Sequence, residues 1–218
     1  MADFTLDDLI HCYRTGVFPM SDARDDACLF LVDPPARGVL PIDGLHIPHR
    51  LARTIRRDDC SVRIDTAFDE MIELCATPAP DRPSTWISHA IQSMYQALFR
   101  RGLAHSVETW RDGRLVGGLY GVAIGGAFFG ESMVSRAPDM SKVALVHLVA
   151  RLRAGGYSLL DCQFQTDHLR QFGVVEIKRA DYRTQLAAAV DRPADFHALP
   201  DGADGKTVLA ILAGAGCL

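Results

Sequence analysis

The sequence lacks the patterns that mark zinc-binding, disulfide-bonded and membrane-spanning proteins. Its six cysteines form no CxxC pair and no Cys/His spacing typical of a metal site. No secretory signal is recognisable, and the apolar run at residues 208–218 is too short to cross a bilayer. We therefore expect reduced cysteines, no bound metal, no membrane attachment and a cytoplasmic location.

An excess of positive charge is also missing. The 218 residues carry 23 Lys and Arg against 27 Asp and Glu, for a formal net charge of -4. A polyanionic partner would therefore have to bind a local basic patch, because the overall field repels it. The chain is 48% hydrophobic and 23% charged, which is typical of a globular protein. We expect a small N-terminal domain over residues 1–61 and a larger domain over residues 62–218.

Two glycine hairpins organise the larger domain. Asp112-Gly and Gly125-Gly are strong turn signals, and the period-two alternation around them predicts an antiparallel meander. Its expected strands are residues 105–110, 115–123 and 127–133. A helix capped by Ser141 and a strand bearing Asp161 follow, and this order is typical of an α+β fold of the N-acetyltransferase (GNAT) type.

Three further helices are predicted from their capping and amphipathic patterns. Thr5, with an acid three residues later, predicts a helix that Gly16 ends. Thr66 is the expected N-cap of a second helix. Residues 86–101 form the clearest amphipathic helix, with Trp86 at its start.

Asp161 and Gln163 are the first candidate functional residues. A strand is predicted to run through both positions, so their side chains are expected to project from the same face, at the end of an otherwise apolar run. Buried polar groups need partners, so this pair is either a satisfied structural pair or a site. The sequence pattern alone slightly favours the structural interpretation.

Arg50, Arg53 and Arg57 lie at positions i, i+3 and i+7 of a helix predicted from Pro48 to about Arg57. Such a stripe is more often a solvated helix face than a binding surface. In a chain that is otherwise acidic, it is also the best candidate for phosphate contacts.

The turn before the helix at Ser141 argues against coenzyme A. Acetyltransferases of this fold bind pyrophosphate with a glycine-rich turn at a helix N-terminus. The corresponding residues 134–141 contain no glycine. We therefore expect an acyl donor other than a coenzyme A thioester and no cofactor.

Nine stretches, taken in order over roughly residues 4–190, resemble the leucyl/phenylalanyl-tRNA protein transferase family. They are Tyr13-Arg-Thr-Gly-Val-Phe-Pro, Pro48-His-Arg-Leu-Ala-Arg-Thr-Ile-Arg, Phe68-Asp-Glu-Met-Ile-Glu-Leu-Cys-Ala, Thr85-Trp-Ile, His105-Ser-Val-Glu-Thr-Trp, Leu115-Val-Gly-Gly-Leu-Tyr-Gly-Val, Phe128-Phe-Gly-Glu-Ser-Met, Ser141-Lys-Val-Ala-Leu and Leu160-Asp-Cys-Gln. The resemblance implies a GNAT-like fold without coenzyme A. It also implies transfer of Leu or Phe, with Met an open third donor, from aminoacyl-tRNA to the N-terminal Arg or Lys of proteins, which marks them for degradation.

The resemblance also implies roles for particular residues. Glu131 and Gln163 are expected around the acceptor amine, with Asp161 polarising the Gln163 carboxamide. The proton of the amine leaves through Gln163, through the ribose hydroxyl of the substrate or through water, and the sequence does not decide among these routes. Trp86 is expected to stack on the terminal adenine of the tRNA, and the arginine stripe to contact the acceptor stem. The donor side-chain pocket is assigned to Leu119, Phe128, Leu145 and Leu160, which would otherwise be ordinary core residues.

Two departures from the family pattern leave alternatives open. The family commonly has tryptophan where this chain has Met20, and a tryptophan pair near Phe30, so the surface that stacks on adenine is altered here. A related tRNA-dependent transferase with another acceptor is the second interpretation. The third is a binding module for tRNA or protein N-termini without turnover.

Overall fold

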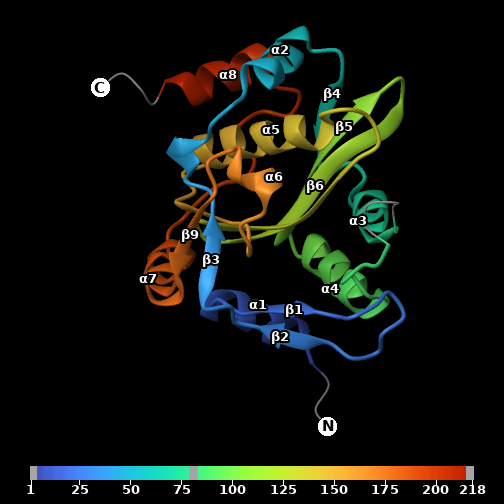
Figure 1. The fold of residues 1–218 in the computed structure, drawn as a ribbon, viewed down its shortest axis with the longest axis vertical. Helices are drawn as coiled ribbons and strands as arrows, with labels where there is room; N and C mark the ends of the chain where they lie inside the picture. The colour runs from blue at the N-terminus through green and yellow to red at the C-terminus, as the bar shows by residue number, and fades with distance from the viewer. Residues whose placement is uncertain (1–3, 79–82, 215–218) are drawn as a thin grey trace.

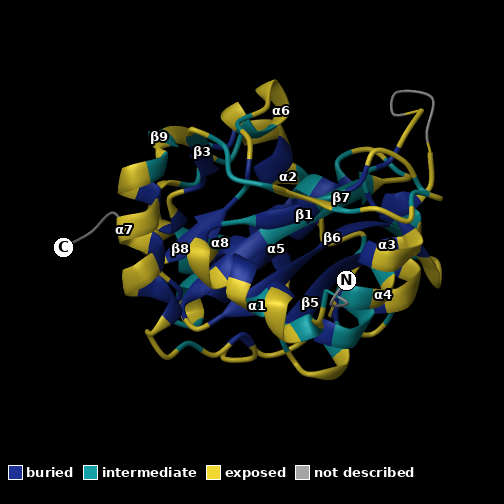
Figure 2. Cartoon of the chain, turned by 90° about the horizontal axis from the view of Figure 1, so that it is seen from below, coloured by how far each residue is buried: buried dark blue, intermediate teal, exposed yellow. Residues whose placement is uncertain are grey.

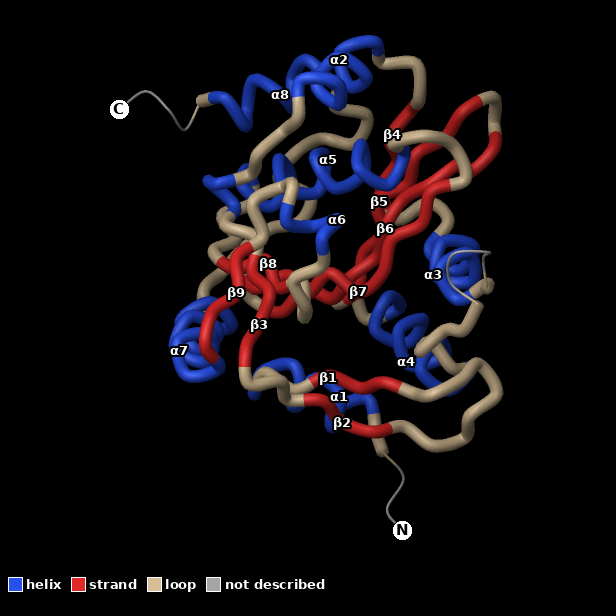
Figure 3. Tube along the Cα trace, in the orientation of Figure 1, coloured by secondary structure: helices blue, strands red, loops and turns tan. Residues whose placement is uncertain are grey.

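The computed structural model describes residues 4–78 and 83–214, which form an α+β fold around a mixed seven-stranded sheet (Figures 1 and 3). The strand order is β4-β5-β6-β7-β8-β3-β9. In that order the strands span Ser61–Ile64, Ala104–Arg111, Arg114–Ile124, Ala127–Ser135, Leu159–Asp161, Ala36–Val39 and Val175–Lys178. A separate two-stranded sheet pairs β1 (Phe18–Met20) with β2 (Phe30–Val32).

The predicted meander is confirmed. Strands β5, β6 and β7 pair antiparallel in sequence order, and the turns between them fall at the two glycine hairpins. Strand β8 then pairs parallel to β7. A parallel pair needs a long connection, and helix α5 (Met140–Ala154) supplies it.

Helices cover both faces of the large sheet. Helices α1 (Leu6–Thr15), α3 (Phe68–Ala76), α4 (His89–Arg100) and α7 (Arg179–Val190) contribute side chains to one hydrophobic core. Helices α2 (His49–Arg57), α5 and α8 (Gly205–Ala213) contribute to a second core. Helix α5 is buried over most of its length (Figure 2). The remaining elements are α6 (Asp167–Arg170) and a 3-10 turn at Ile42–Gly44.

Strand β3 ties the first part of the chain to the large sheet. It lies between β8 and β9 and pairs antiparallel with both. Residues 36–61 therefore contribute a strand to the large sheet, although the sequence grouped them with the N-terminal domain. The small sheet β1–β2 and helix α1 precede β3 in the chain.

The first helix is capped as predicted, but two other capping predictions are wrong. Thr5 forms a capping box with Asp8, and Gly16 ends α1 in a left-handed conformation. The Thr66 hydroxyl instead donates to Glu108, and α3 begins at Phe68. The Ser141 side chain bonds Ser135 rather than capping a helix, and α5 begins one residue before it. Thr66 is engaged by a residue of β5, whereas Ser141 lies inside α5 and its own N–H donates to Ser135 Oγ at 2.8 Å.

Helix α4 is shorter than the sequence predicts. It begins at His89, where Ser88 is the N-cap and accepts a hydrogen bond from the Ile91 N–H, so Trp86 precedes the helix. Among the residues that the structure describes, no helix is long and apolar enough to cross a membrane.

Candidate active site

The candidate site lies where β7 and β8 run side by side, with Phe129 opposite Asp161. The sequence predicted that the strand continues to Gln163, which would place its side chain on the same face as Asp161. That prediction is wrong. Strand β8 ends at Asp161, and Gln163 has a left-handed backbone conformation with φ 55°. The direction of the Gln163 side chain is therefore set by a turn after β8 and not by the alternation of side chains along a strand.

Asp161 is a fully buried carboxylate that forms an ion pair with Arg37. Arg37 donates from Nε to Oδ1 at 2.9 Å and from Nη2 to Oδ2 at 2.7 Å, and the Tyr182 hydroxyl donates to Oδ2 at 2.7 Å. Asp161 meets Gln163 through the backbone, because the Gln163 N–H donates to Oδ1 at 2.8 Å. The expected contact with the Gln163 carboxamide is therefore wrong: Asp161 fixes the turn that carries Gln163.

Sequence reasoning missed Arg37, which lies in a loop-like stretch rich in proline and glycine. The guanidinium group lies 4.5 Å from the Phe18 ring centroid and 4.6 Å from that of Tyr182, and it donates to the Gly16 carbonyl at 3.0 Å. Burial lowers the pKa of Arg37, but its hydrogen bonds to Asp161 and the charge of that carboxylate raise it on balance. The pairing of β3 with β8 brings the two charges together. No local sequence pattern predicts this pairing.

Glu131 lies on β7 and is bound by two buried tyrosines. The Tyr13 hydroxyl donates to Oε1 at 2.7 Å, and the Tyr95 hydroxyl donates to Oε2 at 2.9 Å. Burial raises the pKa of Glu131 to about 7, although the two tyrosine hydrogen bonds lower it. Burial, followed by the nearby Glu131 charge, raises the pKa of both tyrosines, so both stay protonated.

Glu131, Tyr13 and Tyr95 form a ring of oxygen contacts, because the two hydroxyl oxygens are also 2.6 Å apart. Three hydrogen bonds need three protons, and the two hydroxyls supply only two. A protonated Glu131 completes the ring. When Glu131 ionises, both hydroxyls donate to the carboxylate. No hydrogen then remains between the two tyrosine oxygens, so they are no longer hydrogen-bonded to each other. A cation beside Glu131 would favour the ionised form.

An apolar cavity of about 110 Å³ opens beside Glu131 and Gln163. Leu119, Leu145 and Leu160 line it, as the sequence predicted for a side-chain pocket. The Gln163 amide is 3.4 Å from Glu131 Oε1, so both polar groups border the cavity on one side. A dry cavity of about 150 Å³ holds one benzene molecule. The present cavity is therefore of the size of a single aliphatic side chain.

Phe128 is not among the residues that line this cavity. Its ring is fully buried and stacks on Phe196, with 5.6 Å between ring centroids and 11° between planes. Tyr157 packs edge-on at 6.4 Å. The structure thus places Phe128 in the core, and it makes no contribution to the cavity wall.

A second cavity, of about 340 Å³, adjoins the first and shares Glu131 and Gln163 with it. Trp86 lines it, together with Met20. Phe164 also lines it and is 46% exposed, which makes it an aromatic surface that sequence reasoning missed. The signal was available: Phe164 follows Gln163 directly in the sequence.

The predicted arginine stripe lies elsewhere on the surface. Arg50, Arg53 and Arg57 are exposed along α2, and together with Arg111 they border a groove of about 450 Å³. Arg50 is 3.6 Å from Asp139 at the start of α5, which offsets part of its charge. The stripe shares no lining residue with the two cavities at Glu131.

Comparisons with known proteins identify the family. The family described as leucyl/phenylalanyl-tRNA protein transferase matches residues 39–187, and its N-terminal domain matches residues 2–35. The chain belongs to this family. The boundary between the two matches falls just before or within β3, whereas the sequence placed it at residue 61.

Relatives match over nearly the whole chain. A leucyl/phenylalanyl-tRNA--protein transferase of Caulobacter vibrioides is 63% identical over 212 residues, covering 97% of this chain and 98% of its own. Proteins of the same name from Phenylobacterium zucineum and Hyphomonas neptunium are 56% and 57% identical. They cover 97% and 92% of this chain, and 97% and 78% of their own lengths.

Proposed function

We propose that this family member transfers Leu or Phe from aminoacyl-tRNA to the N-terminal Arg or Lys of proteins. The observation that carries the proposal is an apolar cavity with Glu131 and Gln163 at its border. The cavity has the size of an aliphatic donor side chain such as that of leucine, and the acid beside it suits a cationic acceptor. Location in the cytoplasm and marking of the acceptor for degradation belong to the same proposal.

The reaction needs little from the protein beyond orientation. The acceptor α-amine attacks the ester carbonyl carbon, the new amide bond forms, and the bond to the ribose oxygen breaks. The amine loses one proton, and the departing ribose oxygen gains one and becomes a hydroxyl group. Gln163 would position the amine, because a carboxamide is a poor base. Holding both groups in place lowers the barrier by converting a bimolecular step into a unimolecular one.

The fold supports a likeness to N-acetyltransferases. The meander, the α5 crossover and the parallel β7–β8 pair are the parts that such enzymes place around an acyl donor. No glycine lies in the turn before α5, which supports an ester of tRNA over coenzyme A as donor. Trp86 and Phe164 would offer ring faces to the terminal adenine in the second cavity.

The first test is transfer of labelled leucine from charged tRNA to peptides that begin with Arg, Lys, Asp or Ala. We expect transfer to Arg and Lys only, and its loss in Gln163→Ala. Gln171→Ala is the matched control, because its amide donates only to the His168 carbonyl of its own turn. Transfer without preference for Arg or Lys would favour a different acceptor. Binding of tRNA without transfer to any peptide would favour the binding module.

The arginine stripe gives a separate prediction about tRNA affinity. Replacing Arg50, Arg53 and Arg57 together with Gln should weaken tRNA binding and lower its salt dependence. Each phosphate contact contributes about 0.9 to the slope of log K against log salt in duplex DNA, so three lost contacts should lower it by roughly 2–3. Arg101→Gln is the control, because Arg101 already pairs with Asp7. An unchanged slope in the triple variant would make the stripe an ordinary solvated helix face.

A further inference from the structure

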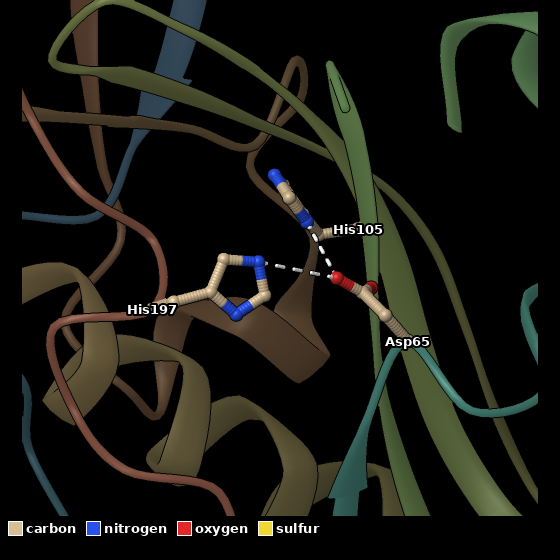
Figure 4. Close-up of side chains that lie close together, drawn as sticks. All are labelled: Asp65, His105 and His197. Carbon is tan, nitrogen blue, oxygen red and sulfur yellow. Dashed lines mark hydrogen bonds and ion pairs between the residues drawn. The ribbon is translucent and has the colours of Figure 1, made fainter. Parts of the chain in front are cut away.

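Asp65, His105 and His197 converge on one point outside the proposed active site (Figure 4). Asp65 follows β4, His105 lies on β5, and His197 lies between α7 and α8. None of the three lines either cavity beside Glu131. One ligand atom from each side chain lies within 4.8 Å of the other two.

The first two groups are held in place by the sheet. Asp65 Oδ2 is 2.7 Å from His105 Nδ1, while Asp65 Oδ1 accepts the Ser106 N–H at 2.7 Å. The His105 ring is stacked on Phe196, with 4.0 Å between centroids and 14° between planes. The second oxygen of the carboxylate and the ring of the imidazole are thereby both fixed. Contacts of this kind orient metal ligands and fix the nitrogen that faces the ion.

The third group approaches from the solvent side. His197 is 54% exposed, and its Nε2 is 3.7 Å from Asp65 Oδ2. Its backbone is anchored, because the His197 N–H donates to Asp195 Oδ1 at 2.8 Å and the neighbouring Phe196 is buried. The side chain can therefore turn toward Asp65 without movement of the loop.

The donor set of two imidazoles and one carboxylate points to a particular class of ion. Zinc binds histidine nitrogen at about 2.0–2.1 Å and carboxylate oxygen at about 2.0–2.2 Å, which separates tetrahedral ligands by about 3.3 Å. The observed 2.7 Å and 3.7 Å separations bracket this value. Imidazole nitrogen suits zinc and its transition-metal neighbours, whereas magnesium and calcium prefer oxygen ligands.

The surrounding charges favour a cation. Arg151 is the basic group packed against this region, and it is already engaged by Asp201 at 3.2 Å and by the Phe196 carbonyl at 2.8 Å. The carboxylates of Asp65, Asp195 and Asp201, which all act on Arg151, together outweigh its single guanidinium.

We propose that Asp65, His105 and His197 bind one zinc-type divalent transition-metal ion, with water completing the tetrahedron on the solvent side. The ion replaces the hydrogen bond between His105 Nδ1 and Asp65 Oδ2, and the His105 ring takes its Nε2–H tautomer, so that one Asp oxygen and two imidazole nitrogens face the ion. The ion fastens the segment between α7 and α8 to strands β4 and β5. Because only the folded chain brings the three ligands together, the ion should stabilise the fold.

The test uses the intact protein, treated with a chelator and then titrated with Zn²⁺ in a calorimeter. We expect one site per chain and a melting temperature that rises with the Zn²⁺ concentration. His197→Gln should weaken the affinity at least tenfold and abolish most of the rise in melting temperature. His89→Gln is the matched control, because His89 is an exposed histidine 3.3 Å from a single carboxylate, that of Asp25. It should leave both quantities unchanged.

Titration with Co²⁺ separates this site from binding by cysteines. We expect the visible bands of a tetrahedral site with nitrogen and oxygen ligands, lost in His197→Gln. Sulfur-to-cobalt charge-transfer bands would place the ion on cysteines and overturn the proposal. Absence of Zn²⁺ binding by the wild type, or equal binding by wild type and His197→Gln, would also overturn it. Because His197 is exposed, its replacement should not prevent folding.

Discussion

Replacing Arg37 with methionine is expected to lower the free energy of unfolding by about 3–5 kcal/mol, the usual cost of leaving one charge of a buried ion pair without its partner. Asp161 is fully buried, and Arg37 is 1% exposed, so water cannot replace the lost contact. The remaining hydrogen bonds of Asp161 come from Tyr182 and the Gln163 N–H. Chemical denaturation of the two proteins under one set of conditions measures the difference.

Two control variants test whether the loss of stability comes from the unpaired buried charge. Arg101→Met removes an equally short but exposed pair with Asp7, at 2.7 Å, and should cost no more than about 1 kcal/mol. The double variant Arg37→Met with Asp161→Leu should recover much of the loss, because replacing both charges removes the unpaired one. If Arg37→Met lowered the free energy of unfolding no more than Arg101→Met does, the Asp161 carboxylate would not depend on Arg37 as its partner, and the prediction would be wrong.

Replacing Glu131 with glutamine is expected to lower kcat/KM for an Arg-initiated peptide by roughly 30-fold or more. Loss of one partner from a desolvated charge pair typically costs about 2–5 kcal/mol. Glutamine keeps the shape of the side chain and can still bond Tyr13 and Tyr95, so the fold should be preserved. The donor site should also be preserved, and the rate of tRNA binding should not change. Asp181→Asn, on the exposed first turn of α7, is the control for a lost surface charge.

The same variant should change the pH profile. The pKa of Glu131 is raised to about 7, so in the free enzyme its charge appears as the pH rises through 7. Transfer to Arg peptides, measured as kcat/KM, should therefore rise between about pH 6 and 8. The acceptor amine titrates near 8 and contributes to the rise in both proteins. The rise in kcat/KM centred near pH 7 should be absent in Glu131→Gln. If the rise persists in this variant, Glu131 does not bind the acceptor.

The raised pKa also has a consequence for stability. A carboxyl group with a higher pKa in the folded state than in the unfolded state stabilises the fold while it is protonated. That contribution is complete below the unfolded value near 4.5 and is lost as the pH rises through about 7. The ring of Glu131, Tyr13 and Tyr95 is therefore most stable on the acid side of neutrality. The acceptor cation would compensate for the charge at higher pH.

The local elements of the fold were predictable because their signals are local. The hairpins at Gly113 and Gly125 have left-handed backbones, with φ 72° and 55°, which glycine adopts without cost. The capping box at Thr5 and Asp8 lies within a single turn. Predictions failed where a distant group competed for the same side chain. Thr66 was expected to cap a helix, but its hydroxyl donates a hydrogen bond to Glu108 of β5 instead.

By itself the sequence determined the family, the α+β class and the meander, and it named three leucines that line one apolar cavity. The tertiary structure alone decided how the polar groups of the site are held. Arg37 and Asp161 are 124 positions apart and meet only because β3 pairs with β8. The convergence of Asp65, His105 and His197 has the same origin. A buried charged group is satisfied by whichever partner lies next to it in the folded chain. The order of the strands in the sheet determines that neighbour, and no local sequence pattern encodes the order.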